Sequence, residues 1–219
     1  MSPAAAPAPT AGLVIAVDGP AAAGKGTLAR TLAQHFGIDH LDTGALYRAV
    51  GLRVLRVGGD PADPTVSEQQ ARALATVDLR HPDLRSMQAA EAASLVATHL
   101  GVRAALLEFQ RRFATHPPGG KGAVLDGRDI GTVVLPDAPH KIFVTASPAA
   151  RAKRRWLELP EASRPALAEI EAQVRQRDAR DQERAIAPLK PAPDAFLLDT
   201  TDLDIDAAFA AAKAYLSRR

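Results

Sequence analysis

Residues 19–27 read Gly-Pro-Ala-Ala-Ala-Gly-Lys-Gly-Thr and are the segment that most constrains this chain. An apolar run of strand type, 13–18, comes directly before them, and a run with helical periodicity, 28–36, comes directly after and stops at Gly37. A strand, a glycine-rich loop, a lysine and a helix in this order predict a loop that binds a nucleoside triphosphate. Backbone N–H groups and the helix N-terminus would face phosphate oxygens, with Lys25 near the β- and γ-phosphates. The alternative is a glycine-rich turn that binds nothing.

The loop departs from the usual phosphate-binding pattern at one position. Ser or Thr usually follows the lysine, where its hydroxyl meets Mg²⁺, whereas here Gly26 follows Lys25 and Thr27 comes next. A Gly-Lys-Gly-Thr ending is typical of the nucleoside monophosphate kinases. The pattern predicts no dedicated metal site, only Mg²⁺ that arrives with ATP and lies near Thr27 and Asp126.

The length and composition of the 219-residue chain limit the kinds of protein it can be. The length is enough for one buried core with small insertions, no apolar run approaches the roughly 18 residues of a membrane helix, and there is no cysteine. The formal charge of +2 is too small to indicate a nucleic-acid partner. Residues 1–12, rich in Ala and Pro, lack signal-peptide features and predict a disordered tail. We therefore expect a cytoplasmic monomer that acts on small molecules and binds neither nucleic acid nor a membrane.

Short apolar strands alternate with helices along the chain, which predicts an α/β fold with a mainly parallel sheet. The expected strands are Leu13–Val17, Ile38–Leu41, Ala123–Leu125, Lys141–Thr145 and Phe196–Leu198. Helices are expected at 28–36, 45–57, 67–75, 86–99, up to about 114, from 148 to about 160, at 165–184 and at 204–216. Residues 77–80 fit either a brief strand or a loop. Residues 13–219 should form a single P-loop domain with three αβα layers and a five-stranded parallel sheet.

Two charged motifs follow predicted strands, at the sheet edge where open parallel sheets bind ligands. Residues 42–48, Asp-Thr-Gly-Ala-Leu-Tyr-Arg, follow the second strand, and residues 126–132, Asp-Gly-Arg-Asp-Ile-Gly-Thr, follow the third. An apolar strand that ends in Asp resembles a Walker B element, whose carboxylate orients Mg²⁺ or its water shell. The alternatives are a plain helix cap with a solvent-facing arginine at 42–48 and a simple turn at 126–132.

A third charged segment, residues 175–184, contains four arginines. On a helix Arg177, Asp181 and Arg184 share one face, where arginines can stabilise the charge of a phosphoryl group in transfer. The alternative is a solvated face with a weak ion pair. The preceding helix carries further arginines at 151, 154 and 155 and predicts part of a lid, about 151–184, that closes over ATP.

Taken together and in this order, the motifs resemble bacterial cytidylate kinase, a family of nucleoside monophosphate kinases. The resemblance runs from about Leu13 to the C-terminus. It rests on Ile-Ala-Val-Asp-Gly-Pro (15–20) with Gly-Lys-Gly-Thr (24–27), Leu-Asp-Thr-Gly-Ala-Leu-Tyr-Arg (41–48), Ala-Ala-Ser (92–94) with Val-Arg (102–103), Asp-Gly-Arg-Asp-Ile-Gly-Thr-Val-Val (126–134), Pro-Asp-Ala-Pro (136–139) with Lys-Ile-Phe (141–143), and Arg-Asp (177–178) leading to Arg-Ala-Ile-Ala-Pro-Leu (184–189). It implies phosphoryl transfer from ATP to CMP or dCMP, which gives ADP and CDP or dCDP.

The resemblance also implies roles for the residues of the site. ATP would be bound by Gly19, Pro20, Ala21, Ala22, Ala23, Gly24, Lys25, Gly26, Thr27 and Arg154. CMP would be bound by Ser94, Arg103 and Asp129 at the cytosine edge, by Arg48 and Arg128 at the phosphate, and by Thr43, Arg177 and Asp181 near phosphate and sugar. Catalysis would depend on Lys25, Arg128, Arg177 and Arg184. An insertion at about 43–115 would hold the monophosphate, and within it residues 77–85 are much shorter than the partly β insert usual in bacterial members.

The chemistry of the acceptor agrees with this residue set. A phosphate monoester is largely ionised at neutral pH, because its second pKa is about 6, so positioning and charge neutralisation matter more than a strong base. The rival functions are another P-loop small-molecule kinase, of the UMP or shikimate type, and a non-catalytic nucleotide-binding module. A GTPase is disfavoured, since it normally reads guanine through Asn-Lys-x-Asp and the chain has no asparagine.

Overall fold

The computed structural model describes residues 12–161 and 164–218, so most of the predicted N-terminal tail lies outside the described residues. Its centre is a five-stranded sheet in the order β2-β3-β1-β4-β5, and every neighbouring pair is parallel. The strands are β1 (Leu13–Asp18), β2 (Asp39–Asp42), β3 (Gly122–Gly127), β4 (His140–Thr145) and β5 (Phe196–Asp199). Each predicted strand is confirmed to within a residue or two at its ends, as is the α/β class.

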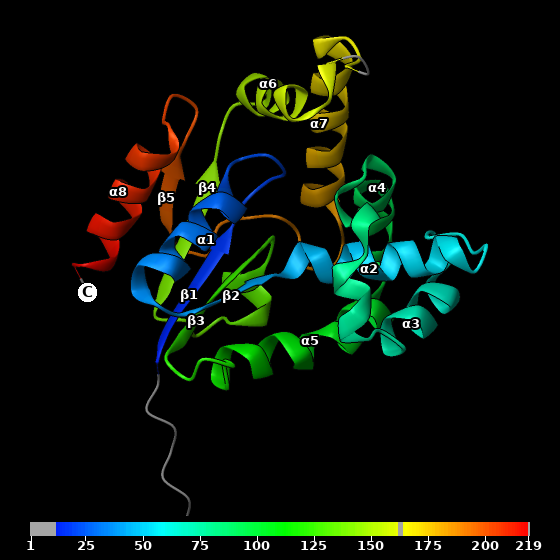
Figure 1. Cartoon of the computed structure of the whole chain (residues 1–219), viewed down its shortest axis with the longest axis horizontal. Coiled ribbons are helices and arrows are strands. Elements are labelled where there is room, and N and C mark those ends of the chain that lie inside the picture. Colours follow the sequence, from blue (N-terminus) through cyan, green and yellow to red (C-terminus); the bar gives the residue numbers. More distant parts are fainter. Residues whose placement is uncertain (1–11, 162–163, 219) are drawn as a thin grey trace, which may run out of the picture.

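Helices cover both faces of the sheet, which confirms the three αβα layers (Figure 1). Because successive strand residues point to opposite faces, Ile15 and Val124 pack under α1 (Lys25–Phe36) and α8 (Ile205–Leu216). Leu125, the next residue along β3, packs on the opposite face with residues of α5 (Leu100–Thr115). Both faces of the central strands are therefore buried, which explains why the strands read as continuous apolar runs.

The remaining helices lie beyond the carboxyl ends of the strands (Figure 1). α2 (Thr43–Arg56), α3 (Pro64–Arg72) and α4 (Met87–Val96) join the start of α5 around separate apolar clusters, with Val50 and Val96 among the fully buried side chains. α6 (Pro148–Glu158) and α7 (Leu167–Glu183) pack around a small cluster of their own. Two helical units, each with its own apolar interior, therefore face the edge of the sheet at which the strands end.

Among the helices between β2 and β3, the structure rejects one of the two alternatives for residues 77–80 and moves one helix boundary. The strand considered for residues 77–80 does not form, because η1 (Thr76–Arg80) is a 3₁₀ turn, and a second such turn, η2 (Pro82–Arg85), follows. The turn is held locally, since the Asp78 carboxylate accepts a hydrogen bond from the Ala75 N–H at 2.9 Å and pairs with Arg53 at 3.0 Å. The helix expected at 67–75 begins earlier, at Pro64, because the Asp63 side chain caps its first turn.

Two apolar helices, α4 and α5, carry much of the interior of this insertion. Among the described residues no single helix is long and apolar enough to cross a membrane, and α4 and α5 reach that length only as a pair bent by 102°. α4 packs closely on α2, where Gly51 faces Ala92. A Cβ on Gly51 would lie 2.7 Å from the Cβ of Ala92 and 3.0 Å from its carbonyl carbon. The two helices can therefore approach this closely only because position 51 has no side chain.

Replacement of this glycine should destabilise the protein. Alanine in a helix interior is normally about 1 kcal/mol better than glycine, yet Gly51→Ala is expected to lower the free energy of unfolding by about 1–3 kcal/mol, because α4 must move away. Urea unfolding followed by circular dichroism measures the change. The comparison variant is Gly101→Ala, whose Cβ would meet Cγ, Cδ and Oε2 of Glu68, a half-exposed side chain that can rotate away once its ion pair with Arg72 opens. Equal stability of Gly51→Ala and the parent chain would contradict this account of the α2–α4 contact.

Candidate functional site

The loop between β1 and α1 has the geometry of a phosphate-binding turn. Gly24, just before α1, has a φ of 87°, a left-handed conformation that glycine adopts without strain. Ala22 also lies in this region, at 59°, which costs an alanine roughly 1 kcal/mol. The first N–H groups of a helix have no partner within it and carry the positive end of its dipole. The residues predicted to bind the phosphates share this turn: Gly19, Pro20, Ala21, Ala22, Ala23, Gly24, Lys25, Gly26 and Thr27.

Lys25 lies among other charged groups at the start of α1. The pKa of its ammonium is lowered to about 7, first by burial and then by Arg128, whereas Asp126 and Asp42 act in the opposite direction. An anion beside the ammonium would raise this pKa again, because an opposite charge favours the protonated form. The position therefore suits the phosphates of a nucleotide.

Asp126, near the end of β3, presents a buried carboxylate to the same loop. Its Oδ2 lies 2.7 Å from Nε2 of His40, and its carbonyl oxygen accepts a hydrogen bond from Thr43 Oγ1 at 2.7 Å. Its Oδ1 faces the loop, since a Cβ built on Gly26 would lie 3.6 Å away. Among the described residues no group of three His, Cys, Asp or Glu side chains could hold a metal. A single carboxylate beside phosphates fits Mg²⁺ that is held mainly by a nucleotide.

Asp18 fixes the end of β1 to the segment after β3. Its carboxylate accepts hydrogen bonds from the backbone N–H groups of Ile130 and Gly131, each at 2.7 Å. Burial raises the pKa of Asp18 to about 7, and the two N–H donors oppose part of that rise. These contacts hold the backbone immediately after Asp129, where a π-helical turn, η3 (Ile130–Val134), begins.

The predicted catalytic arginines gather around Asp181 of α7. Arg128 Nε donates to Asp181 Oδ2 at 2.9 Å. Burial alone would raise the pKa of Asp181, but Arg128 and Arg177 bring it below its ordinary value. Burial and then Arg128 lower the pKa of Arg177 to about 10, so this guanidinium stays charged at neutral pH. Arg184 lies just beyond the last residue of α7, with extended backbone, yet it remains close enough to Asp181 to interact with it.

Several buried N–H donors of these arginines have no hydrogen-bond acceptor within the described part of the chain. They are Nε of Arg48, Nε of Arg177, and Nε and Nη2 of Arg184. Buried polar groups in proteins are nearly always paired, so donors of this kind indicate a ligand with several acceptor oxygens. Arginine forks match phosphate geometry in particular. The cluster therefore indicates a second phosphate position, beyond the P-loop.

A buried ion pair lies next to this cluster, between Arg103 of α5 and Asp129. Arg103 also lies 6.0 Å from the ring centre of Tyr47. Ser94 of α4 is buried, and its Oγ accepts a hydrogen bond from Arg180 Nη1 at 3.1 Å. Arg184 interacts electrostatically with both Arg103 and Asp129, so the structure brings these three residues together. Ser94 is joined to α7 through Arg180.

Asp42 and Arg48 form a pair at the start of α2. The Asp42 carboxylate caps the helix by accepting from the Ala45 N–H at 3.1 Å, and it pairs with Arg48 Nη2 at 2.7 Å. Burial alone would raise the pKa of Asp42, but Arg48 brings it below its ordinary value. The predicted alternative for Arg48, a solvent-facing side chain, is wrong, because the side chain is only 24% exposed and pairs with Asp42.

Two arginines of α6 connect the predicted lid to the core. Arg151 is buried, donates to Asp178 Oδ1 at 2.8 Å and reaches the carbonyl oxygen of Ala21 in the P-loop at 3.2 Å. Arg154 donates to Thr200 Oγ1 at 3.1 Å, and that hydroxyl donates in turn to the Ala23 carbonyl at 3.0 Å. Arg154 is therefore linked to the loop through Thr200, and its predicted contact with ATP stays a prediction.

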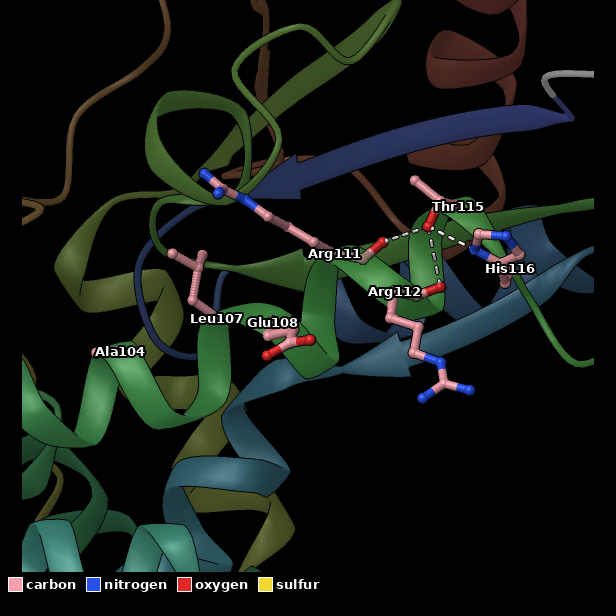
Figure 2. Close-up of a pocket in the computed structure, with 7 residues that line it drawn as sticks. All are labelled: Ala104, Leu107, Glu108, Arg111, Arg112, Thr115 and His116. Atoms are coloured by element: carbon pink, nitrogen blue, oxygen red, sulfur yellow. Dashed lines mark hydrogen bonds between the residues drawn. The ribbon is translucent and has the colours of Figure 1, made fainter. Parts of the chain in front are cut away.

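Two hollows of the surface differ in their relation to this site. One, of about 430 Å³, lies between α4 and the α6–α7 pair and includes Arg177 and Arg180. A larger one, of about 640 Å³, lies along α5 and contains no predicted site residue (Figure 2). There Arg111 points away from its helix and donates to the carbonyls of Val133 and Val134. The smaller hollow therefore adjoins the predicted acceptor side, and the larger one does not.

Three residues that hold the site have no role predicted from the sequence. Asp18 follows the predicted strand Leu13–Val17, and its place directly before the loop is the signal for it. Arg180 lies one turn from Arg177 on a predicted helix, which is the signal for a place at the same site. His40 had no signal of its own, because only the pairing of β2 with β3 brings it to Asp126.

Comparison with known proteins agrees with the motifs. Residues 15–217 match the protein family described as cytidylate kinase. Two proteins named cytidylate kinase, from Paramagnetospirillum magneticum and Acidiphilium cryptum, are 62% and 57% identical to the chain, over 91% of it and over 95% and 93% of their own lengths. A solved structure of an uncharacterized protein from Eubacterium ventriosum shares the fold alone, with a TM-score of 0.55 and 15% identity over 94% of this chain and 99% of that one. The resemblance drawn from the motifs is confirmed, and the chain belongs to the cytidylate kinase family.

Proposed function

We propose that this protein transfers the γ-phosphoryl group of ATP to CMP or dCMP and releases ADP and CDP or dCDP. The observation that carries the proposal is the set of buried, unpaired N–H donors on Arg48, Arg177 and Arg184. They lie beside Arg128 and beyond the P-loop, as a phosphate acceptor requires. An alcohol acceptor would instead need a carboxylate free to take its proton, and Asp126, Asp129 and Asp181 are each already paired.

We assign the donor half of the site to the P-loop. The phosphates of ATP would meet the N–H groups of residues 19–27, with Lys25 beside the β- and γ-phosphates and Arg154 farther along the nucleotide. Mg²⁺ would arrive with ATP and lie near Thr27 and Asp126, where it neutralises charge on the phosphates. Asp126 supplies the carboxylate for it, and no residue is required to serve as a strong base.

We assign the acceptor half to the arginine cluster. Arg48 and Arg128 would hold the phosphate of CMP, while Thr43, Arg177 and Asp181 lie at its phosphate and sugar. Because the acceptor is already ionised, its approach to ATP is limited mainly by charge repulsion. Lys25, Arg128, Arg177 and Arg184 reduce that repulsion and stabilise the charge spread over the moving phosphoryl group. Their carboxylate partners hold them in place before substrates bind, so little reorganisation is needed.

The cytosine edge would be read by Ser94, Arg103 and Asp129. Cytosine presents an amino donor beside a ring-nitrogen acceptor, which complements a carboxylate acceptor next to a guanidinium donor. The Arg103–Asp129 pair offers that combination in a buried position. Uracil presents a carbonyl where cytosine has the amino group, so Asp129 would disfavour UMP.

The apolar clusters support two separate substrate-binding segments within one domain. We propose that residues 43–115 form the monophosphate-binding insertion and that about 151–184 form a lid, because each has an interior of its own. Closure of both would exclude water from the transfer, which protects the phosphoryl group from hydrolysis. We further propose that the protein works as a cytoplasmic monomer on small nucleotides, with neither nucleic acid nor a membrane as a partner.

The substrate assignment is tested by ADP release. With ATP and Mg²⁺ present, CMP and dCMP should give the highest kcat/KM in a coupled assay that also includes UMP, AMP and shikimate. A better rate with UMP or shikimate would favour the rival kinases. ATP binding without turnover on any acceptor would favour a non-catalytic nucleotide-binding module.

Lys25 should take up a proton when ATP binds. Its pKa is lowered to about 7 in the free protein, and adjacent phosphates raise it, so ATP affinity should fall as pH rises above that value. Calorimetry at pH 7.5, in buffers of different ionisation enthalpy, should report up to about three quarters of a proton more for the parent chain than for Lys25→Arg, whose side chain stays charged. Any proton that ATP itself gains or loses is the same in the two titrations, so it cancels in the difference. Equal proton uptake by the two proteins would contradict the lowered pKa of Lys25. Near-normal turnover of Lys25→Ala would contradict its role beside the phosphates of ATP.

Asp129 should set the preference for cytosine. Asp129→Asn is expected to lower kcat/KM for CMP by roughly 10- to 100-fold, because a charged hydrogen bond is lost, while UMP is affected less. Asp181→Asn is the matched control, since this buried carboxylate also pairs with an arginine but lies near the phosphate and sugar. It should lower kcat/KM for both nucleotides alike. An unchanged CMP-to-UMP ratio in Asp129→Asn would remove this residue from base recognition.

A further inference from the structure

We propose that His40 is a positioning residue for phosphoryl transfer, because it holds the Asp126 carboxylate toward the P-loop where Gly26 supplies no hydroxyl. The inference rests on the proposed function only in requiring that Mg²⁺ and ATP bind at this loop. It does not depend on the identity of the acceptor. His40 belongs to none of the sequence motifs and to none of the groups assigned to ATP, CMP or Mg²⁺.

The pairing of β2 with β3 brings His40 to Asp126. The strands run parallel, with His40 opposite Val124 and Asp42 opposite Asp126. Since alternate residues point to the same face, His40 and Asp126 share the face on which Val124 packs under α1. The His40 side chain is 18% exposed and that of Asp126 only 4%, with 2.7 Å between Nε2 and Oδ2. A carboxylate can only accept, so Nε2–H of His40 is the donor.

This hydrogen bond restricts how the carboxylate can rotate. With Oδ2 on His40, the other oxygen, Oδ1, faces position 26 of the P-loop. In the usual P-loop a Ser or Thr hydroxyl at this position and the strand-end carboxylate both serve Mg²⁺. Here position 26 has no hydroxyl, so the orientation of the Asp126 carboxylate matters more. Hydrogen-bond partners of ligating carboxylates typically contribute roughly 10- to 100-fold to metal affinity.

A purely structural role for His40 makes a different prediction. If the histidine only satisfies a buried acid, its loss should lower stability and affect ATP binding equally with and without Mg²⁺. If it positions Asp126, the loss should appear only when Mg²⁺ is present. The decisive quantity is therefore the ratio of ATP affinity in Mg²⁺ to ATP affinity in EDTA.

Calorimetric titration of ATP into the full-length chain measures this ratio without any acceptor. His40→Leu should lower the ratio roughly 10-fold and leave the affinity in EDTA unchanged, whereas His40→Gln, whose amide can still donate, should retain most of it. In the coupled assay, the Mg²⁺ concentration for half-maximal rate should rise in His40→Leu while the KM for CMP stays constant. If His40→Leu does not fold, His40→Asn, polar but too short to reach Asp126, carries the same expectation.

A second substitution tests directly whether His40 and Asp126 make up for the missing hydroxyl at position 26. A side chain at position 26 would meet Oδ1 of Asp126 at ordinary contact distance, so Gly26→Ser can supply the missing hydroxyl. The double variant His40→Leu with Gly26→Ser should recover most of the Mg²⁺-dependent affinity. The proposal is overturned if the ratio is unchanged in His40→Leu, if ATP affinity falls equally in Mg²⁺ and EDTA, or if the double variant recovers nothing. Failure of CMP as acceptor, with the ratio behaving as expected, would reject only the substrate assignment.

Discussion

Partly buried positive charge at the carboxyl edge of the sheet is the constraint on which the rest of this structure depends. Lys25, Arg177 and Arg184 each lose favourable hydration there, and burial is the main cause of their lowered pKa values. Such a cluster is stable only if carboxylates hold it in the free protein and phosphates complete it in the complex. The fold meets the first condition with acids at strand ends and on α7, and the reaction meets the second with two nucleotides.

The carboxylates do more than balance charge, because each also fixes a piece of backbone or a neighbouring side chain. Asp18 ties the end of β1 to the segment after β3, and Asp42 caps α2 while it directs Arg48. Asp126 joins β3 to His40 of β2, and Asp181 brings Arg128 against α7. The groups proposed to bind phosphate are therefore held in place by contacts within the protein itself. Such positioning is the main means by which an enzyme can accelerate phosphoryl transfer without a strong base.

Much of the fold was predictable, for identifiable reasons. Apart from β2, which reads Asp-His-Leu-Asp, the strands are short and mainly apolar runs bounded by turns. The P-loop is recognised by residue types at fixed spacing, so both are local properties of the chain. The predictions that differ from the structure concern residues 64–80. There the side chains of Asp63 and Asp78 bind nearby backbone N–H groups and fix short turns, while the helical periodicity of the sequence is weak. The predicted face of Arg177 and Asp181 on one helix was right, but the helix ends one residue before Arg184.

The sequence by itself determined the donor half of this protein, because a phosphate loop is built from contiguous residues between one strand and one helix. It also contains the residues proposed for the acceptor as separate motifs, all within the region 15–217 that matches the family. Only the tertiary structure decided which of them meet: the parallel pairing of β2 with β3 brings His40 to Asp126, and the packing of α7 over the sheet edge brings Asp181 to Arg128. These contacts join residues far apart in the chain, and their partners depend on strand order and helix packing, which no local pattern specifies.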